Sequence, residues 1–220
     1  MRLASIEVRL IDSMGNDHTV VRSARISFGR GAGNLLTDRD KHLIEYLANH
    51  GHYSPFEHCA ATLLIKCPLY IRSQIHRHRT FSYNEISRRY TEENLEFYIP
   101  FVLNKQGSAN KQSGGDQIDT SYVLAQSAFR HAIQNSLHWY HELLGRHGVS
   151  REQARSVLPQ NLMTQFYMTG NLRNWAAFIK IRDHEDAQRE VQIVADGCRK
   201  ILRELFPYSL GELLAERTHS

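Results

Sequence analysis

The sequence predicts an α+β fold whose second half is rich in helices. Two segments in the first half are typical of strands: the N-terminal stretch of residues 1–17 and the apolar run of residues 59–67. From Thr120 onward the apolar residues recur at helical spacing. The chain has 220 residues, which is enough to bury a proper core, and we expect one domain over residues 1–220.

The composition is that of a globular protein. Charged residues make up 23% and hydrophobic residues 41% of the chain, which argues against a disordered or fibrous protein. The N-terminal stretch scatters charges among its apolar residues, unlike a secretory signal. No window approaches the roughly 18 consecutive apolar residues that a membrane helix needs. We therefore expect a soluble, cytoplasmic protein without a membrane partner.

The first half reads as an alternation of helices and strands. Residues 17–27 are expected to form a short helix, and the glycine-rich residues 29–34 a connector, because they lack the Lys-Ser/Thr ending of a phosphate-binding loop. Thr37 is the expected N-cap of a helix that stops at Gly51. After the strand of residues 59–67, Pro68 is expected to open the next helix.

The second half begins with a polar, glycine-rich segment. Residues 104–119 have nothing to bury, so we expect a mobile surface loop and not a domain boundary. Beyond it the apolar spacing predicts four helices, over residues 122–145, 150–158, 171–181 and 185–206.

Three cysteines, Cys59, Cys67 and Cys198, are too far apart for CxxC chemistry and odd in number. This usage fits a reducing compartment with buried thiols. Cys59 and Cys67 are eight residues apart, an even spacing that places both on one face of the predicted strand, the face toward the core.

The most distinctive stretch is RHRTFSYNEISRRY, residues 77–90, which gathers four arginines and a histidine around Glu85. Guanidinium groups direct two donors at an anion and suit phosphate. A solvated basic helix end is the structural alternative, because cations complement the dipole where the preceding helix ends. The interleaved Ser, Asn, Tyr and Phe residues favour a binding site, since a solvated face more often carries Lys and Glu.

A second group of similar chemistry follows in the helical half, at Arg155, Asn171, Arg173 and Arg182. The thirteen histidines show no HExxH or Cys/His spacing, so a metal site is not favoured. Ser87 has neither a neighbouring base nor a strained turn in the sequence, which argues against a serine nucleophile. The net charge of +4 permits an anionic ligand without indicating nucleic acid.

The motif resembles the signature of the flavin-dependent thymidylate synthases, Arg-His-Arg-x-x-Ser-x-Asn-Glu-x-Ser-x-Arg followed by tyrosine. Further segments are similar to blocks of that family, and the resemblance spans most of residues 15–210 without residues 104–119. These segments are DKHLIEYLANHGHYSPFEH, EFYIP, REQARSVLP and NLRNWAAFIKIRDHEDAQREV.

The resemblance implies a homotetramer of α+β subunits, each with a mainly antiparallel sheet flanked by helices. FAD would bind at the subunit junctions, so active sites would be shared between chains. The implied reaction is reductive methylation of dUMP to dTMP. Methylenetetrahydrofolate would give the carbon, and NADPH would reduce the flavin.

The resemblance also implies two sets of contact residues. The dUMP set is Gln74, Arg77, Glu85, Ser87, Arg88, Arg89, Arg155 and Arg182. The FAD set is His52, Ser54, Arg77, His78, Arg79, Glu85, Asn171 and Arg173. One position departs from the family, since Ala177 stands where Asn or His is usual, and a flavin contact there is absent or replaced.

No cysteine sits in any plausible site, so the poorly nucleophilic uracil ring needs another source of activation. An arginine facing the pyrimidine carbonyls would stabilise developing negative charge, and reduced flavin would supply the hydride chemistry. We expect Arg182 to be the catalytic residue and Ser87 only to position dUMP. Two other functions remain open from the residues alone: a non-catalytic nucleic-acid-binding module and a metal-dependent nucleotide hydrolase.

Overall fold

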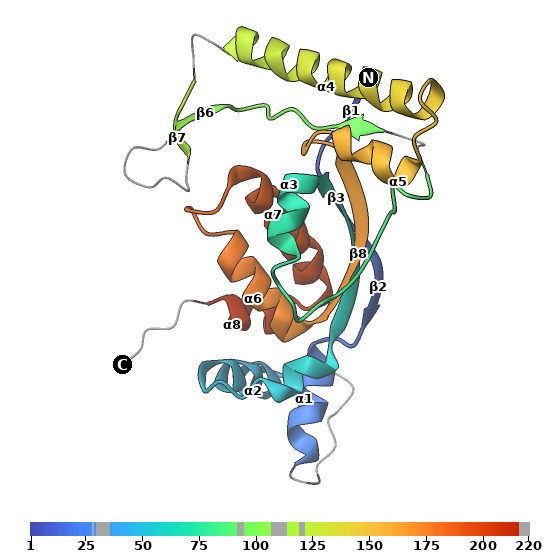
Figure 1. Cartoon of the computed structure of the whole chain (residues 1–220). Coiled ribbons are helices and arrows are strands. Elements are labelled where there is room, and N and C mark those ends of the chain that lie inside the picture. The colour runs from blue at the N-terminus through green and yellow to red at the C-terminus, as the bar shows by residue number, and fades with distance from the viewer. Residues whose placement is uncertain (28, 30–35, 92–94, 107–113, 119–121, 216–220) are drawn as a thin grey trace. The chain divides into compact units, whose positions relative to one another are not determined.

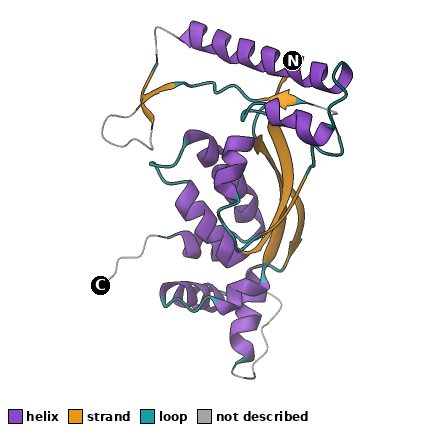
Figure 2. Ribbon diagram, viewed as in Figure 1, coloured by secondary structure: helices purple, strands orange, loops and turns teal. Residues whose placement is uncertain are grey.

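The computed structural model describes residues 1–27, 29, 36–91, 95–106, 114–118 and 122–215. Within these residues the fold is α+β, as predicted, with eight α-helices and a mainly antiparallel four-stranded sheet (Figures 1 and 2). None of the described helices is long and apolar enough to cross a membrane.

The main sheet has the strand order β2-β3-β8-β4. Its strands are β2 (Glu7–Met14), β3 (Ala60–Pro68), β8 (Met163–Asn171) and β4 (Ser82–Glu85). Two small pairs accompany it: β1 (Arg2–Leu3) lies parallel to β5 (Glu96–Phe97), and β6 (Asn104–Gln106) lies antiparallel to β7 (Gly114–Gln117). The predicted strands of residues 1–17 and 59–67 are confirmed, whereas β8 and β4 were not predicted.

Seven of the eight described α-helices agree with the predicted positions to within a few residues. The eight helices are α1 (Asp17–Ile26), α2 (Asp38–Asn49), α3 (Leu69–Ile75), α4 (Tyr122–Gly145), α5 (Arg151–Ala154), α6 (Leu172–Arg182), α7 (Arg189–Leu205) and α8 (Pro207–Leu214). Two 3-10 turns join them, η1 (Ser54–His58) and η2 (Arg155–Val157). Helix α8 was not predicted.

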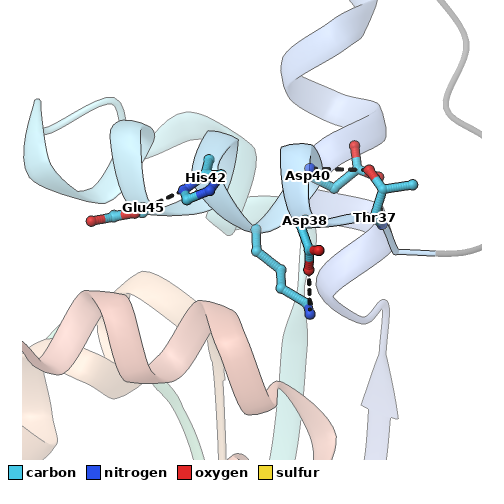
Figure 3. Close-up of polar contacts among 6 residues, drawn as sticks. Thr37, Asp38, Asp40, His42 and Glu45 are labelled. Atoms are coloured by element: carbon cyan, nitrogen blue, oxygen red, sulfur yellow. Dashed lines mark hydrogen bonds and ion pairs between the residues drawn. The ribbon is translucent and has the colours of Figure 1, made fainter.

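The start of helix α2 was predicted correctly from the N-cap preference for threonine. Thr37 is its N-cap: the Thr37 hydroxyl accepts a hydrogen bond from the Asp40 backbone N–H at 3.3 Å, and Asp40 Oδ2 accepts from the Thr37 backbone N–H at 2.9 Å (Figure 3). This reciprocal capping box satisfies donors that a helix start leaves unpaired. On the exposed face of the same helix, His42 Nδ1 lies 3.4 Å from Glu45 Oε2 (Figure 3).

The chain forms two compact units. The first unit comprises Met1–Ile6, Lys66–Arg77 and Glu85–Phe166, and the second comprises Glu7–Ile65, His78–Asn84 and Tyr167–Ser220. Strands β3, β4 and β8 each begin in one unit and end in the other. One domain over the whole chain remains a prediction.

The first unit packs α4 over an apolar cluster. Ile133 and Tyr140 of α4 are buried with Phe97 of β5, and Leu158 and Leu162 complete the cluster. Burying such side chains stabilises a fold by about 1.5–3 kcal/mol each. This packing sets the long helix α4 against the segments that precede β8.

The second unit packs helices α6, α7 and α8 against one another, and α7 also against β2 (Figure 1). Trp175 of α6 is fully buried, and its indole N–H donates to the Ala61 carbonyl of β3 at 3.1 Å. Gly197 lets α7 approach the sheet closely, because a Cβ there would come within 2.9 Å of Val8. These contacts hold α6 against β3 and α7 against β2.

Two predicted loops fall partly outside the described residues. Within residues 104–119 the structure shows the β6–β7 ladder, with Asn104 opposite Gln117, while 107–113 and 119 are not described. The expected mobility of this segment remains a prediction. Of the connector at residues 29–34, only Gly29 is described, with a φ of +62°.

All three cysteines are free thiols and fully buried, as predicted. Burial raises the pKa of the Cys59 thiol to about 12, and it also raises the pKa values of Cys67 and Cys198. Since the thiolate is the nucleophilic form, these side chains are chemically inert at neutral pH.

Candidate active site

The first unit contains a cavity of about 560 Å³ in which the C-terminal half of the arginine-rich motif meets α3, β8 and the turn after α5. Six of its polar lining residues are Arg72, Glu85, Ser87, Arg88, Glu152 and Arg155. Three guanidinium groups and a serine hydroxyl in one cavity suit a phosphate-bearing ligand.

Backbone pairing explains why these side chains meet. The Ile86 N–H donates to the Gln165 carbonyl at 3.0 Å, which places Glu85 beside Thr164 of β8. The Leu69 N–H donates to the Leu162 carbonyl at 3.0 Å, which fixes the start of α3. One helical turn separates Leu69 from Arg72, so both side chains project from one face of α3, and both line the cavity.

Glu85 has two partners in the cavity wall. The Thr164 hydroxyl donates to Glu85 Oε1 at 2.6 Å. Arg72 Nε lies 3.3 Å from the same oxygen, and the two side chains are 31% and 25% exposed. The carboxylate is therefore held from α3 and from β8 while remaining accessible to a ligand.

The other two cavity arginines are fastened to backbone carbonyls. Arg88 Nη2 donates to the Met163 carbonyl at 3.4 Å, and Arg155 Nε donates to the Glu152 carbonyl at 3.1 Å. Burial lowers the pKa of Arg88, but a guanidinium stays charged in proteins. Ser87 Oγ accepts from the Arg89 backbone N–H at 3.3 Å. Arg88 also lines a neighbouring cavity of about 330 Å³.

Three further residues of the predicted dUMP set are not among the described lining residues of this cavity. Gln74 is half-buried near the end of α3, and Arg77 is exposed. Arg89 is exposed and lies 3.6 Å from the carboxylate of Glu152, which does line the cavity. Arg89 therefore lies close to the cavity rim.

Arg182 belongs to the second unit and is held by His78. Its Nε donates to His78 Nε2 at 2.9 Å, so the imidazole accepts at Nε2 and carries its proton on Nδ1. The His78 ring meets Phe178 of α6 edge-on, with centroids 4.9 Å apart. Burial and the nearby Arg182 cation lower the pKa of His78, which keeps the ring neutral at pH 7.

Two other predicted flavin residues lie at the start of α6. Asn171 is its N-cap, and Asn171 Oδ1 accepts from the Asn174 N–H at 2.9 Å. Arg173 pairs with Glu57 at 2.6 Å and lies over the Tyr53 ring, 4.9 Å from its centroid. Arg79 of the motif and Ala177 of α6 are both exposed.

A larger cavity of about 930 Å³ in the second unit is lined by the two remaining residues of the flavin set, His52 and Ser54. Arg25, His42 and His58 line it as well. The cavity is rich in donors and large enough for a sizeable cofactor fragment.

The structure thus distributes the predicted residues over both units, and it adds two that were missed. Arg72 precedes the motif, and its spacing of one helical turn from Leu69 was the signal that the two side chains share a face of the predicted helix. Thr164 belongs to β8, whose alternating burial at Thr164, Phe166 and Met168 reflects a period of two that was present in the sequence. Among the described residues, no group of three His, Cys, Asp or Glu side chains is placed to hold a metal ion.

Comparisons with known proteins agree on one family. Residues 9–208 match the family model Thy1, described as thymidylate synthase complementing protein. A flavin-dependent thymidylate synthase of Thermosipho africanus is 41% identical over 209 residues, covering 94% of this chain and 90% of the relative. The enzyme of the same name from Thermus thermophilus is 41% identical over 200 residues, covering 91% of this chain and 72% of the relative.

Among solved structures, a UMP/dUMP methylase, PolB, from Streptomyces cacaoi, bound with 5-Br dUMP, is similar with a TM-score of 0.86. It is 34% identical, and the alignment covers 96% of each chain. The motif of residues 77–90, the arginine-lined cavity that it helps to form and the match over residues 9–208 together show that the chain belongs to the thymidylate synthase complementing protein family.

Proposed function

We propose that the protein is a flavin-dependent thymidylate synthase that converts dUMP into dTMP by reductive methylation. The observation that carries this proposal is the cavity of the first unit, where Arg88, Arg155 and Ser87 surround space for an anion and Glu85 lies among them. Membership of the family and the dUMP analogue bound by the PolB methylase support the same substrate.

The cavity suits a nucleoside monophosphate in size and in charge. Its volume of about 560 Å³ lies within the usual range of small-ligand pockets. Arg88 and Arg155 match the phosphate, whereas the Glu85 carboxylate would repel it and instead accepts from a hydroxyl or an N–H of the nucleotide. The ligand is thereby oriented as well as bound.

A cysteine nucleophile is not part of the proposed mechanism. Cys59, Cys67 and Cys198 are fully buried, and burial raises their thiol pKa values. We assign the activation of the pyrimidine to the positive charge of Arg182, which stabilises negative charge developing on the uracil carbonyls. His78 holds the Arg182 Nε and so orients the guanidinium plane.

The residues present fit a flavin. The donor-rich cavity at His52 and Ser54 has the size for it, and Arg173 and Asn171 are held in place at the start of α6. With these we assign Arg77, His78, Arg79 and Glu85 to FAD binding. When bound, the flavin supplies the hydride chemistry that no side chain can perform. Methylenetetrahydrofolate is the proposed carbon donor and NADPH the proposed reductant.

The proposed assembly is a homotetramer with active sites shared between chains. A phosphate, a pyrimidine and a flavin together need more arginine than one motif can direct at one point, and the predicted residues are distributed over both units. The proposed location is the cytoplasm, with no nucleic-acid or membrane partner.

Flavin absorbance tests the proposal. The purified protein should be yellow or take up FAD, and dUMP should perturb its visible spectrum. A colourless protein that ignores FAD and binds oligonucleotides with a steep salt dependence would instead be a nucleic-acid-binding module. Nucleotide hydrolysis that a chelator abolishes would indicate a metal-dependent hydrolase. UMP is the ligand to compare with dUMP in this measurement, because PolB is described as a methylase of both nucleotides.

A further inference from the structure

Arg72 lies in the wall of the nucleotide cavity although it precedes the arginine-rich motif. It comes from the middle of α3, and its side chain is 31% exposed. Arg155 donates to a backbone carbonyl, whereas Arg72 contacts a carboxylate. The three cavity arginines are therefore not equivalent.

Both partners of Glu85 use the same oxygen. Thr164 Oγ1 donates to Oε1 at 2.6 Å, and Arg72 Nε lies 3.3 Å from Oε1. Among the described residues, no hydrogen bond or ion pair reaches Oε2. A carboxylate held at one oxygen from two secondary-structure elements has a fixed plane, and its second oxygen is the acceptor that remains for a ligand.

The charges in the cavity also indicate that Arg72 belongs with Glu85 and not with the phosphate. A carboxylate next to an anionic ligand is unfavourable unless a cation compensates it, and Arg72 is a cation in contact with Glu85. A guanidinium that already neutralises a carboxylate has less charge to offer a phosphate. Arg155 is oriented by a neutral backbone carbonyl and lines the same cavity, which makes it a better phosphate ligand than Arg72.

We propose that Arg72 is a positioning residue of the nucleotide site: with Thr164 it orients Glu85, and Glu85 Oε2 accepts a hydrogen bond from a hydroxyl or N–H of the nucleotide. Arg72 thus acts on the ligand through Glu85 and does not bind the phosphate. The inference rests on the proposed function, because it takes a uridine monophosphate as the ligand.

A double-mutant cycle tests this proposal in the full-length protein loaded with FAD. The variants are Arg72→Met, Glu85→Gln and the double variant, and the ligand is dUMP, titrated by calorimetry. Arg146→Met is the control, because it removes an exposed arginine that is paired with Glu142 outside the cavity. Arg72→Met should weaken dUMP binding about tenfold, and the control should leave it unchanged.

The coupling between the Arg72 and Glu85 substitutions shows whether Arg72 positions Glu85 or binds the phosphate. If Arg72 acts through Glu85, the double variant should bind dUMP no more weakly than Glu85→Gln alone. Deoxyuridine, which lacks the phosphate, should lose the same factor as dUMP when Arg72 is replaced. Additive losses, or an Arg72→Met effect that disappears with deoxyuridine, would show a direct phosphate contact and overturn the proposal.

Thr164→Val tests the same group of contacts from β8, because it removes the hydroxyl that donates to Oε1. It should also be coupled to Glu85→Gln, which keeps the proposal testable if Arg72→Met does not fold. Additive losses in a protein whose parent makes dTMP would refute only the role of Arg72. A parent protein that binds FAD but neither dUMP nor deoxyuridine would refute the proposed function together with this inference.

Discussion

Ser87 and Arg182 have different partners, which is why we propose different roles for them. Ser87 Oγ accepts from the Arg89 backbone N–H, and no side-chain base contacts it among the described residues. Arg182 is half-buried and anchored at Nε by His78. An oriented cation can stabilise a developing negative charge, whereas a hydroxyl without a base can only position a ligand.

Replacing each residue separates these roles. With dUMP saturating, Arg182→Ala should lower kcat at least about 100-fold, the usual cost of losing one preorganised electrostatic donor. Ser87→Ala should keep kcat within about tenfold and mainly raise KM, because only a binding contact is lost. Steady-state dTMP formation measures both. An inactive serine variant beside a nearly normal arginine variant would reverse the assignment.

The contact between His78 and Arg182 also predicts a pH dependence. Burial and Arg182 lower the pKa of His78 below its ordinary value of about 6.5, so the ring is neutral and accepting at pH 7. As the pH falls below the lowered pKa, protonation of His78 Nε2 removes the acceptor and places two cations, His78 and Arg182, together. We therefore expect kcat to fall on the acid side.

The variant His78→Gln keeps an acceptor that does not titrate, so its kcat should lose this acid step. The matched control is His76→Gln, because burial also lowers the pKa of His76, whose ring packs edge-on against Phe166. The control should retain the step in a pH profile of kcat. An acid step that persists unchanged in His78→Gln would contradict the assigned role of the contact.

At the level of elements, local signals were sufficient for some segments and not for others. The start of α2 was predictable because Thr37 and Asp40 cap it within four residues. The start of α3 was predictable from Pro68, which is its N-cap. Strand β8 was missed because its place between β3 and β4 depends on pairing with strands distant in sequence.

Helix α8 was missed for a different reason. Pro207 follows Phe206 directly, and a proline there indicates the end of the preceding helix, whereas the structure uses it to begin a new one. The backbone N–H groups of Tyr208 and Ser209 donate to the Asp17 carboxylate at 3.1 and 2.8 Å. This cap comes from the opposite end of the chain, so no local pattern could reveal it.

The Asp17 cap has a measurable cost of removal. Asp17→Ala should lower the free energy of unfolding by about 1–3 kcal/mol, because two N–H groups, one buried and one partly buried, lose their acceptor. The control Asp38→Ala removes a first-turn carboxylate that is 88% exposed and should cost clearly less, because water replaces its contacts. Urea denaturation compares the two. Equal losses would mean that Asp17 is not a specific cap.

At the scale of the whole molecule, the motif identified the family and half of the proposed binding residues, but it could not assign them to places in the fold. Glu85, Ser87, Arg88 and Arg155 lie in the first unit, and His78, Arg173 and Arg182 lie in the second. Sequence spacing carries no information about which distant segments share a cavity. Arg72 and Thr164 therefore emerged only from the structure.

The proposed sharing of active sites between chains predicts an obligatory assembly. Size-exclusion chromatography with light scattering should give four times the chain mass, and dTMP synthesis should decline on dilution below the range in which the tetramer persists. An active monomer would contradict this part of the account.

The central claim is thymidylate synthesis without a cysteine nucleophile. The direct measurement is dTMP formation from dUMP, methylenetetrahydrofolate and NADPH by the variant in which Cys59, Cys67 and Cys198 are all replaced by alanine. Because the three thiols are fully buried, we predict a variant that is less stable and still makes dTMP with a kcat near that of the parent protein. A variant that folds by circular dichroism, binds FAD and forms no dTMP would contradict the account.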